Sequence, residues 1–206
     1  MSQVLEEVES SSSLLILKKS ISTAVLAAKY LEKETSRNFI LKASKMISNA
    51  FENGNKIIIA GNGGSLCDAS HFAEELTGQF SKPRAALPAI ALSDPGHLTC
   101  VSNDMGFHRV FARGVEAYGK ENDIFIGLTT SGNSENIFQA FNEAEKRGLK
   151  TIAFLGKTGG KAAGCADLEW IVSGFETTDR IQESHMAAIH IIIELIEHKL
   201  FYENKS

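Results

Sequence analysis

Cysteine is scarce in this 206-residue sequence and shows no pairing pattern. The three cysteines, Cys67, Cys100 and Cys165, are odd in number and widely spaced, and none belongs to a CxxC pair. This argues against a disulfide scaffold and a zinc ribbon and favours a reducing compartment. No apolar run reaches the ~18–20 residues of a membrane-spanning helix, and the first residues carry acids where a signal peptide carries bases. We therefore expect a cytoplasmic protein without a membrane partner.

The sequence also lacks an excess of basic residues. Its 21 Lys and Arg residues are outnumbered by 25 Asp and Glu residues, which gives a net charge of -4. Proteins that bind nucleic acid usually carry a basic surface, so we expect no nucleic-acid partner. With 43% hydrophobic and 22% charged residues, the composition is that of a globular chain with one sizeable core.

A glycine-rich stretch, Gly61–Ser65, lacks the features of a nucleotide-binding loop. The dinucleotide fingerprint G-x-G-x-x-G fails at Leu66, and no G-K-[ST] of a Walker loop follows. The stretch lies between an apolar β-branched run and a segment of good helix formers. Such a strand–turn–helix unit points backbone N–H groups and a helix N-terminus at one spot, which suits an anion. A tight turn that only needs glycine dihedral angles is the alternative.

Apolar periodicity predicts strands that alternate with helices. Strands are expected at Lys56–Ala60, Pro88–Leu92, Ile124–Leu128, Thr151–Leu155 and Leu168–Val172. Between them, helices are expected at Ser65–Thr77, His97–Asn103, Phe107–Tyr118, Ser134–Arg147 and Lys161–Gly164. This order indicates an α/β fold with a parallel sheet covered on both faces.

The helices that flank this core complete a single domain, expected to span residues 14–206. Two helices, at about 14–30 and 36–53, precede the αβα core of residues 56–175, and a long helix at 178–202 follows it. The first two either pack against another subunit or simply cover the sheet. Residues 1–13, acidic and then serine-rich, are expected to form a flexible tail or the cap of the first helix.

Hydroxyl groups gather in the segment Thr129–Ser134, which follows an apolar strand and opens a helix. Such hydroxyls and helix N-terminal amides can surround a phosphate without any lysine. Ser, Thr and Asn also favour helix caps, but their density here exceeds what capping needs. Ligands of an open parallel sheet lie beyond the carboxyl ends of its strands, so we expect a phosphate site there.

Asp94 and Asp104 either hold a polyol hydroxyl or cap helices.

His71 and Glu75 are spaced i, i+4 and therefore share one face of a helix. A metal site could combine them with one or two of Gln182, His185 and His190 from the last helix. The spacing does not match HExxH, and it does not choose between His185 and His190. A histidine on the surface, or one satisfied in the core, is the competing interpretation.

Taken together, these motifs resemble the phosphoheptose isomerases of the sugar-isomerase (SIS) domain superfamily. The resemblance runs from about Ser36 to Phe201 and rests on GNGGS, HFAEELTG, ALSD, SNDMGF, TTSGNS, LGKTGGK and DRIQESH. It implies a flavodoxin-like αβα sandwich with a five-stranded parallel sheet, and a homotetramer with active sites between subunits. It also implies an aldose–ketose isomerase that converts D-sedoheptulose 7-phosphate to D-glycero-D-manno-heptose 7-phosphate, the first step towards the ADP-heptose of lipopolysaccharide.

The same resemblance assigns roles to individual residues. It implies Glu75 and His190 as the catalytic acid/base pair, and one Zn2+ per subunit held by His71, Glu75, Gln182 and His190. The implied substrate contacts are Asn62, Gly63, Gly64, Ser65, Glu75, Asn103, Asp104, Thr129, Thr130, Ser131, Ser134 and Gln182.

One position departs from the family pattern. Gln79 stands where the family commonly has an arginine associated with the substrate, and Arg84 or Lys82 could compensate. The departure motivates an alternative, an isomerase of another sugar phosphate. A further alternative is the SIS-fold protein that binds the replication initiator DnaA and is not an isomerase. That protein is expected to lack the set formed by His71, Glu75, Gln182 and His190.

Overall fold

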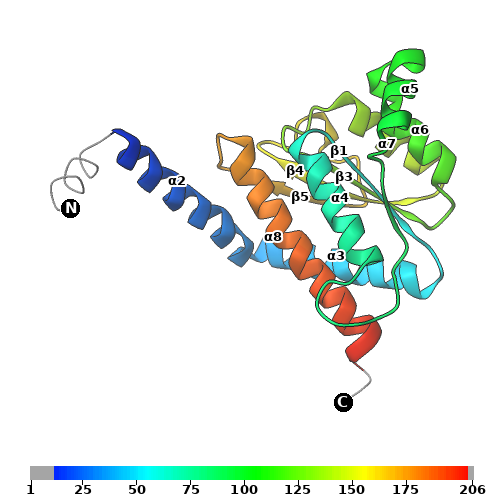
Figure 1. Ribbon diagram of the computed structural model, residues 1–206, viewed down its shortest axis with the longest axis horizontal. Coiled ribbons are helices and arrows are strands. Elements are labelled where there is room, and N and C mark those ends of the chain that lie inside the picture. Colours follow the sequence, from blue (N-terminus) through cyan, green and yellow to red (C-terminus); the bar gives the residue numbers. More distant parts are fainter. Residues whose placement is uncertain (1–11, 204–206) are drawn as a thin grey trace.

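The structure, a computed structural model, describes residues 12–203 and alternates strands with helices as expected (Figure 1). The strands are β1 (Ile57–Gly61), β2 (Ala89–Ala91), β3 (Ile124–Thr129), β4 (Lys150–Gly156) and β5 (Leu168–Val172). The α-helices are α2 (Ser12–Lys29), α3 (Glu34–Glu52), α4 (Gly64–Thr77), α5 (Pro95–Met105), α6 (Val110–Tyr118), α7 (Glu135–Lys146) and α8 (Thr178–Glu197). Short 3-10 turns are η1 (Tyr30–Glu32), η2 (Phe107–Arg109) and η3 (Gly160–Ala162), and the π-helical turn η4 (His198–Tyr202) continues α8.

The five strands form one sheet in the order β2-β1-β3-β4-β5, and every neighbouring pair is parallel. All residues of β1 and β3 are buried, which explains their unbroken apolar sequences. The chain leaves β1 for β2 on one side and then crosses to β3 on the other. This strand order is the flavodoxin-like one, whose topological switch point lies between β1 and β3.

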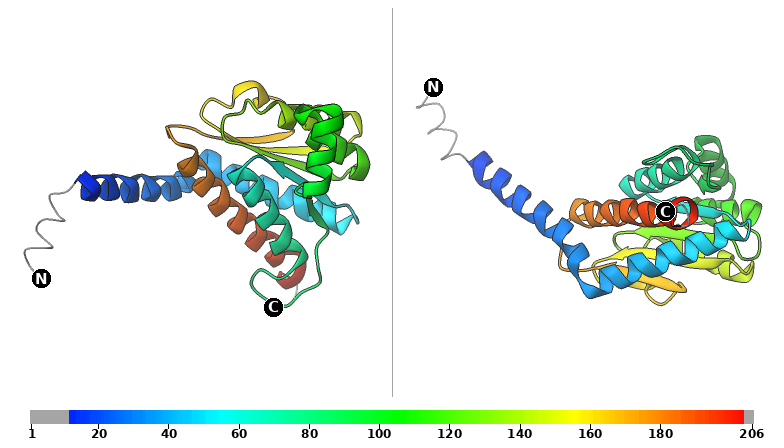
Figure 2. Two further views of the ribbon diagram at one scale, coloured as in Figure 1. Left: turned by 45° about the horizontal axis from the view of Figure 1, so that its top comes forward. Right: turned by 90° about the horizontal axis from the view of Figure 1, so that it is seen from below.

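Successive residues of β1 point into two separate cores, one on each face of the sheet. Ile57 and Ile59 belong to the core that α3, α4 and α8 cover, whereas Ile58 and Ala60 belong to the core covered by α5, α6 and α7. The alternation follows from the two-residue period of a strand. Figure 2 shows the helices on both sides of the sheet, and the predicted αβα sandwich is therefore confirmed.

The first two helices differ in what they contact. α3 buries Phe39, Ile40 and Ile47 against the sheet. α2 instead projects from the body as an arm (Figures 1 and 2) and exposes a set of large apolar side chains: Leu15, Ile16, Leu17, Ile21, Val25 and Leu26. The expected tail over residues 1–13 is wrong at its end, because Ser12 and Ser13 already belong to α2. Residues 1–11 lie outside the described part of the chain.

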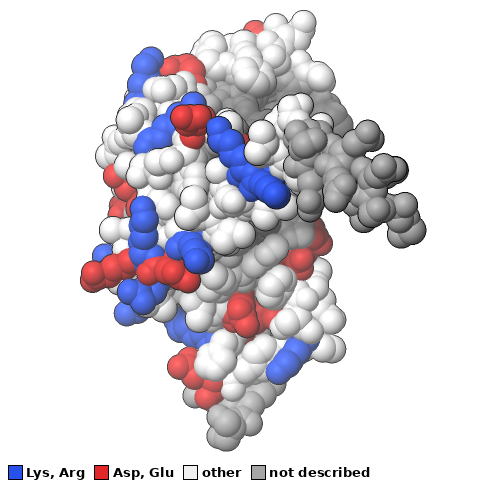
Figure 3. Space-filling view, turned by 90° about the vertical axis from the view of Figure 1, so that its left-hand side faces the viewer, with Lys and Arg blue, Asp and Glu red and all other residues white. Residues whose placement is uncertain are grey.

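Seen from the side on which α2 projects, Lys and Arg side chains are interspersed with Asp and Glu (Figure 3). Among the helices of residues 12–203, none combines the length and the apolar character that crossing a membrane requires.

Candidate active site

A cavity of about 290 Å³ opens at the carboxyl ends of β1 and β3, at the switch point of the sheet. Its lining comes from the loops after these two strands and from the start of α8. The lining residues are Asn62, Gly63, Gly64, Ser65, Leu128, Thr129, Thr130, Ser131, Ser134, Thr178 and Gln182. Six of these residues carry hydroxyl groups, and none is lysine or arginine. The structure thus brings both predicted loops to one place.

Three helices begin at this cavity. Gly64 is the first residue of α4, Ser134 is the N-cap of α7, and Thr178 is the first residue of α8. Each helix N-terminus carries a partial positive charge and unpaired backbone N–H groups. Three such termini around one cavity attract an anion without any cationic side chain. The arrangement therefore suits a phosphate group.

The Thr129–Ser134 loop is held in shape by its own hydroxyls and by a close neighbour. The Thr129 and Ser134 hydroxyl oxygens lie 3.0 Å apart. Gly132 has a φ of +68°, and a Cβ there would lie 1.9 Å from the backbone oxygen of Gly159. Any side chain at position 132 would thus force this loop away from the loop of Gly159. Position 132 therefore requires glycine for two reasons, the close approach to the Gly159 backbone and the positive φ.

Asn136 joins the two loops, and the sequence analysis did not single it out. Its side-chain amide and that of Asn62 each donate to the other's oxygen at 2.9 Å. Asn136 is buried at the start of α7, while Asn62 belongs to the glycine turn after β1. The paired amides fix the glycine turn against α7 at the cavity. An asparagine at the start of an expected helix is common, so the sequence carries no specific signal for this pairing.

A second polar cluster lies further along α4 and α8. The Nε2 atoms of His71 and His190 are 3.0 Å apart, and Nε2 of His71 lies 3.5 Å from Oε1 of Glu75. The structure therefore brings together His71, Glu75 and His190, which the resemblance had linked. Gln182 is not bonded to this cluster; its amide Nε2 lies 3.5 Å from the Ser65 hydroxyl at the cavity.

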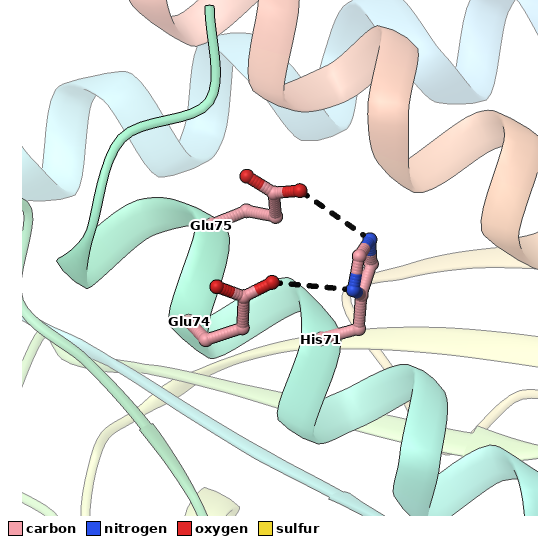
Figure 4. A group of neighbouring side chains, drawn as sticks. All are labelled: His71, Glu74 and Glu75. Atoms are coloured by element: carbon pink, nitrogen blue, oxygen red, sulfur yellow. Dashed lines mark ion pairs between the residues drawn. The ribbon is translucent and has the colours of Figure 1, made fainter. Parts of the chain in front are cut away.

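Glu74 adds a second carboxylate to the α4 side of the cluster (Figure 4). Its Oε1 lies 3.3 Å from Nδ1 of His71, and its side chain is 63% exposed, against 19% for Glu75. The potential ligand atoms of His71, Glu74 and Glu75 all lie within 4.8 Å of one another. Two imidazoles and carboxylates at this spacing fit the donor preferences of zinc. The i, i+3 spacing from His71 could have identified Glu74 in the sequence.

Asp68, one turn before His71 on α4, was also missed. Its Oδ2 atom is buried and, among the described residues, accepts no hydrogen bond. Burial raises the pKa of this carboxyl group to about 6, although the nearby His71 acts in the opposite direction. A carboxylate beside the cluster thus titrates close to neutral pH.

His185 is a core residue and not a candidate ligand. It is fully buried, its Nε2 faces the backbone oxygen of Leu155 at 3.0 Å, and its ring packs on Phe154 and Trp170. Burial lowers its pKa to about 4. Of the two histidines that spacing left open, only His190 lies beside His71.

The buried His185 predicts that stability falls in weak acid. Its pKa is lower in the folded protein than in the unfolded chain, where it is about 6.5, so the unfolded chain binds the proton first. The contribution is complete above pH ~6.5 and is lost as the pH falls towards 4, by up to about 3 kcal/mol. Urea unfolding at a series of pH values measures it. His185→Leu should flatten this part of the profile, and an unchanged profile would contradict the assignment.

Asn103, Asp104 and Asp94 do not line the cavity. Asn103 and Asp104 are exposed near the end of α5, where the Asn103 amide donates to Asp104 at 2.7 Å. Asp94 caps the start of α5, because its Oδ1 accepts from the backbone N–H of His97 at 2.7 Å. Capping was one of the two interpretations of Asp94, and the structure bears it out.

Comparison with known proteins agrees with this geometry. The SIS domain family matches residues 23–156. The phosphoheptose isomerase of Fusobacterium nucleatum is 52% identical over 87% of this chain and 92% of its own length. That of Vibrio cholerae is 50% identical over 90% of this chain and 97% of its own. The chain belongs to the phosphoheptose isomerase family. A solved phosphoheptose isomerase from Francisella tularensis has a TM-score of 0.86 and 34% identity, over 91% of this chain and 100% of that one.

Membership of the phosphoheptose isomerase family makes this chain a sugar-phosphate isomerase and leaves the DnaA-binding alternative without support. Gln79, which stands where the family commonly has an arginine, is exposed just after α4. Arg84 does not compensate for the missing arginine, because its guanidinium is buried and bonded to Glu197 and to backbone oxygens. Lys82 lies over the ring of Tyr202, 5.1 Å from its centroid. The suggested compensation by Arg84 is therefore wrong.

Proposed function

We propose that this protein interconverts D-sedoheptulose 7-phosphate and D-glycero-D-manno-heptose 7-phosphate. The observation that carries the proposal is a phosphate-type cavity and a histidine–carboxylate cluster that share two helices, α4 and α8. The cavity would bind the phosphate, and the cluster would exchange protons at C1 and C2. Relatives that are half identical over most of their length and are named phosphoheptose isomerases support the same substrate.

The separation of the two parts suits a long sugar phosphate. Gln182 at the cavity and His190 in the cluster are eight residues apart on α8, which is ~12 Å along the helix axis. With single bonds of about 1.5 Å, an extended seven-carbon chain places C1 on the order of 10 Å from a phosphate on C7. A phosphate held in the cavity would therefore orient the reacting end towards His190, and its binding energy would serve catalysis.

The isomerisation needs a base at one carbon and an acid at the neighbouring oxygen. We assign Glu75 as the base that removes the proton from the carbon and returns it after the double bond has moved. His190 moves the second proton between the C1 and C2 oxygens, since imidazole both donates and accepts near neutral pH. Glu75 is only 19% exposed, so few water molecules compete for the proton that it holds.

Zinc is the cofactor that we propose for this site. His71, Glu75 and His190 would hold it, with Gln182 after a change of side-chain direction, and Glu74 offers a further carboxylate. The chemistry that Zn2+ supplies in such a site is polarisation of the substrate oxygens. A carboxylate that ligates a metal is a weaker base, so Glu75 must alternate between the two roles.

We also propose a homotetramer in the cytoplasm that supplies heptose for lipopolysaccharide. The apolar side chains that α2 exposes support assembly, because an apolar surface of this kind commonly marks a protein–protein contact. Asn103 and Asp104 are exposed and outside the cavity of their own subunit, which is consistent with contacts to substrate in a neighbouring one.

The deciding experiment is incubation of the purified protein with sedoheptulose 7-phosphate. Substrate and product have equal mass, so NMR follows the conversion of the ketose signals into those of the aldose. A panel of shorter ketose phosphates tests the alternative that Gln79 raises. Conversion of a shorter ketose phosphate with no turnover of the heptulose would replace the proposed substrate.

A further inference from the structure

A buried ion pair joins the segment after α4 to the end of α8. Nε of Arg84 lies 2.6 Å from Oε1 of Glu197, and the two side chains are 0% and 2% exposed. The Ser81 hydroxyl donates to the other oxygen of Glu197 at 2.8 Å. We call Arg84, Glu197 and Ser81 the Arg84 clasp.

The clasp closes the last turn of α4 from outside the helix. Nη2 of Arg84 donates to the backbone oxygen of Glu75 at 2.7 Å. Nη1 donates to the backbone oxygens of Leu76, Gly78 and Ala85 at 2.8, 3.2 and 3.0 Å. The last carbonyls of a helix have no partner within it, so an arginine that binds them sets where the helix ends. The turn that Arg84 holds is the turn that carries Glu75.

The other end of the clasp reaches the helix that carries His190. Glu197 follows His190 by seven residues on α8, which is about two turns, so both side chains lie on one side of the helix. The segment between α4 and Arg84 also places the Phe80 ring 5.8 Å from the His190 ring. Arg84 thus connects the backbone at Glu75 with the end of α8, and Phe80 lies in the segment between them.

The energetics of buried charges favour a role beyond stability. The free energy needed to remove two ions from water offsets most of the attraction between them. Replacement of a buried ion pair by apolar side chains is therefore often neutral or stabilising. A guanidinium fork bonded on all sides does impose one geometry on its partners. The distances that need such control are the 3.0 and 3.5 Å contacts of His71 with His190 and Glu75.

We propose that the Arg84 clasp is a set of positioning residues for the proton-transfer cluster. It holds α4 and α8 in the register that brings Glu75 and His190 to His71. The inference rests on the isomerase function proposed above for the cluster. None of the three clasp residues lines the phosphate cavity.

The double variant Arg84→Met/Glu197→Leu tests the clasp, because it leaves no unpaired buried charge. We expect it to fold with a melting temperature below that of the wild type, because the backbone oxygens that Arg84 binds lose their donor although no buried charge is left unpaired. We expect kcat to fall roughly 10- to 100-fold, because small misplacements of reacting groups have effects of this size. KM for sedoheptulose 7-phosphate should change less than about threefold, since the cavity is separate. Arg84→Lys keeps the charge without the fork and should recover only part of kcat.

A matched control uses the ion pair of Lys56 and Asp123, which directly precede β1 and β3. Asp123 is buried and also accepts backbone N–H bonds from Lys56 and Lys120, at 3.0 and 2.9 Å. Asp123→Asn should lower the melting temperature and leave kcat and KM within about twofold of the wild type. A clasp that acts only through stability would behave in the same way as this control.

Wild-type kcat in the double variant, or a loss confined to KM, would overturn the inference. Failure of the wild-type protein to isomerise the sugar would instead overturn the proposed function. In that case the histidine ring signals in 1H–15N NMR spectra still test the clasp. The double variant should shift the signals of His71 and His190 and leave that of His185 in place. Unchanged signals of His71 and His190 would refute the positioning role of the clasp.

Discussion

We expect Glu75→Gln to abolish measurable turnover and to leave sugar-phosphate binding largely intact. The amide keeps the shape of the carboxylate but cannot remove a proton from carbon, and general-base catalysis is worth roughly 10²–10⁴-fold in rate. The phosphate cavity is formed by other residues, so its contribution to affinity is retained. Turnover is followed by NMR, and binding by calorimetry with inorganic phosphate and with the sugar phosphate.

The neighbouring Glu74 provides the matched control for this substitution. Glu74→Gln changes an exposed carboxylate that contacts the other nitrogen of the same histidine. Its kcat should fall by about tenfold, far less than in Glu75→Gln, because Glu74 supports His71 from outside the pair that transfers protons. Near-wild-type turnover in Glu75→Gln, or equal losses in both variants, would sink the assignment of Glu75 as the base.

Removal of bound metal should lower turnover strongly, and added zinc should restore it. The donor atoms of His71, Glu74 and Glu75 already lie within 4.8 Å of one another, and His190 contacts His71 at 3.0 Å. The measurement is kcat after dialysis against a chelator, with the metal content of each sample. We expect kcat to fall at least about tenfold, because substitution of residues that only support metal ligands already has effects of this size.

His190 on α8 and His198, the first residue of η4, supply the control for the metal. His190→Asn should lose zinc and activity together, whereas His198→Asn, eight residues further at an exposed position, should keep both. Full activity in protein shown to be free of metal would remove zinc from the mechanism. Zinc retained in His190→Asn would remove this residue from the ligand set.

Much of the fold could be predicted because it depends on local sequence. Strands such as Ile57–Gly61 are apolar throughout, as parallel strands buried on both faces must be, and they were predicted to within two residues. The glycine turn and the hydroxyl-rich loop were predicted to form an anion site because strand, turn and helix follow one another directly in the chain. The zinc and catalytic assignments came from resemblance, since an i, i+4 pair of polar residues is common on any helix.

Other features depend on contacts between residues that are distant in the chain. Asn62 and Asn136 are 74 positions apart, and their pairing exists only because β1 and β3 are neighbours in the sheet. In the sequence, Arg84 was a candidate to replace the missing substrate arginine, yet the fold buries it against Glu197. No local pattern distinguishes an arginine that faces a substrate from one that closes a helix.

The sequence by itself determined the α/β class, the order of elements and the phosphate-type loops, because hydrophobic period and turn chemistry act over a few residues. Only the tertiary structure decided which histidine of α8 is available for chemistry. His185 and His190 lie five residues apart, so they point to different sides of the helix. One side meets Phe154 and Trp170 in the core, and the other meets His71 on α4.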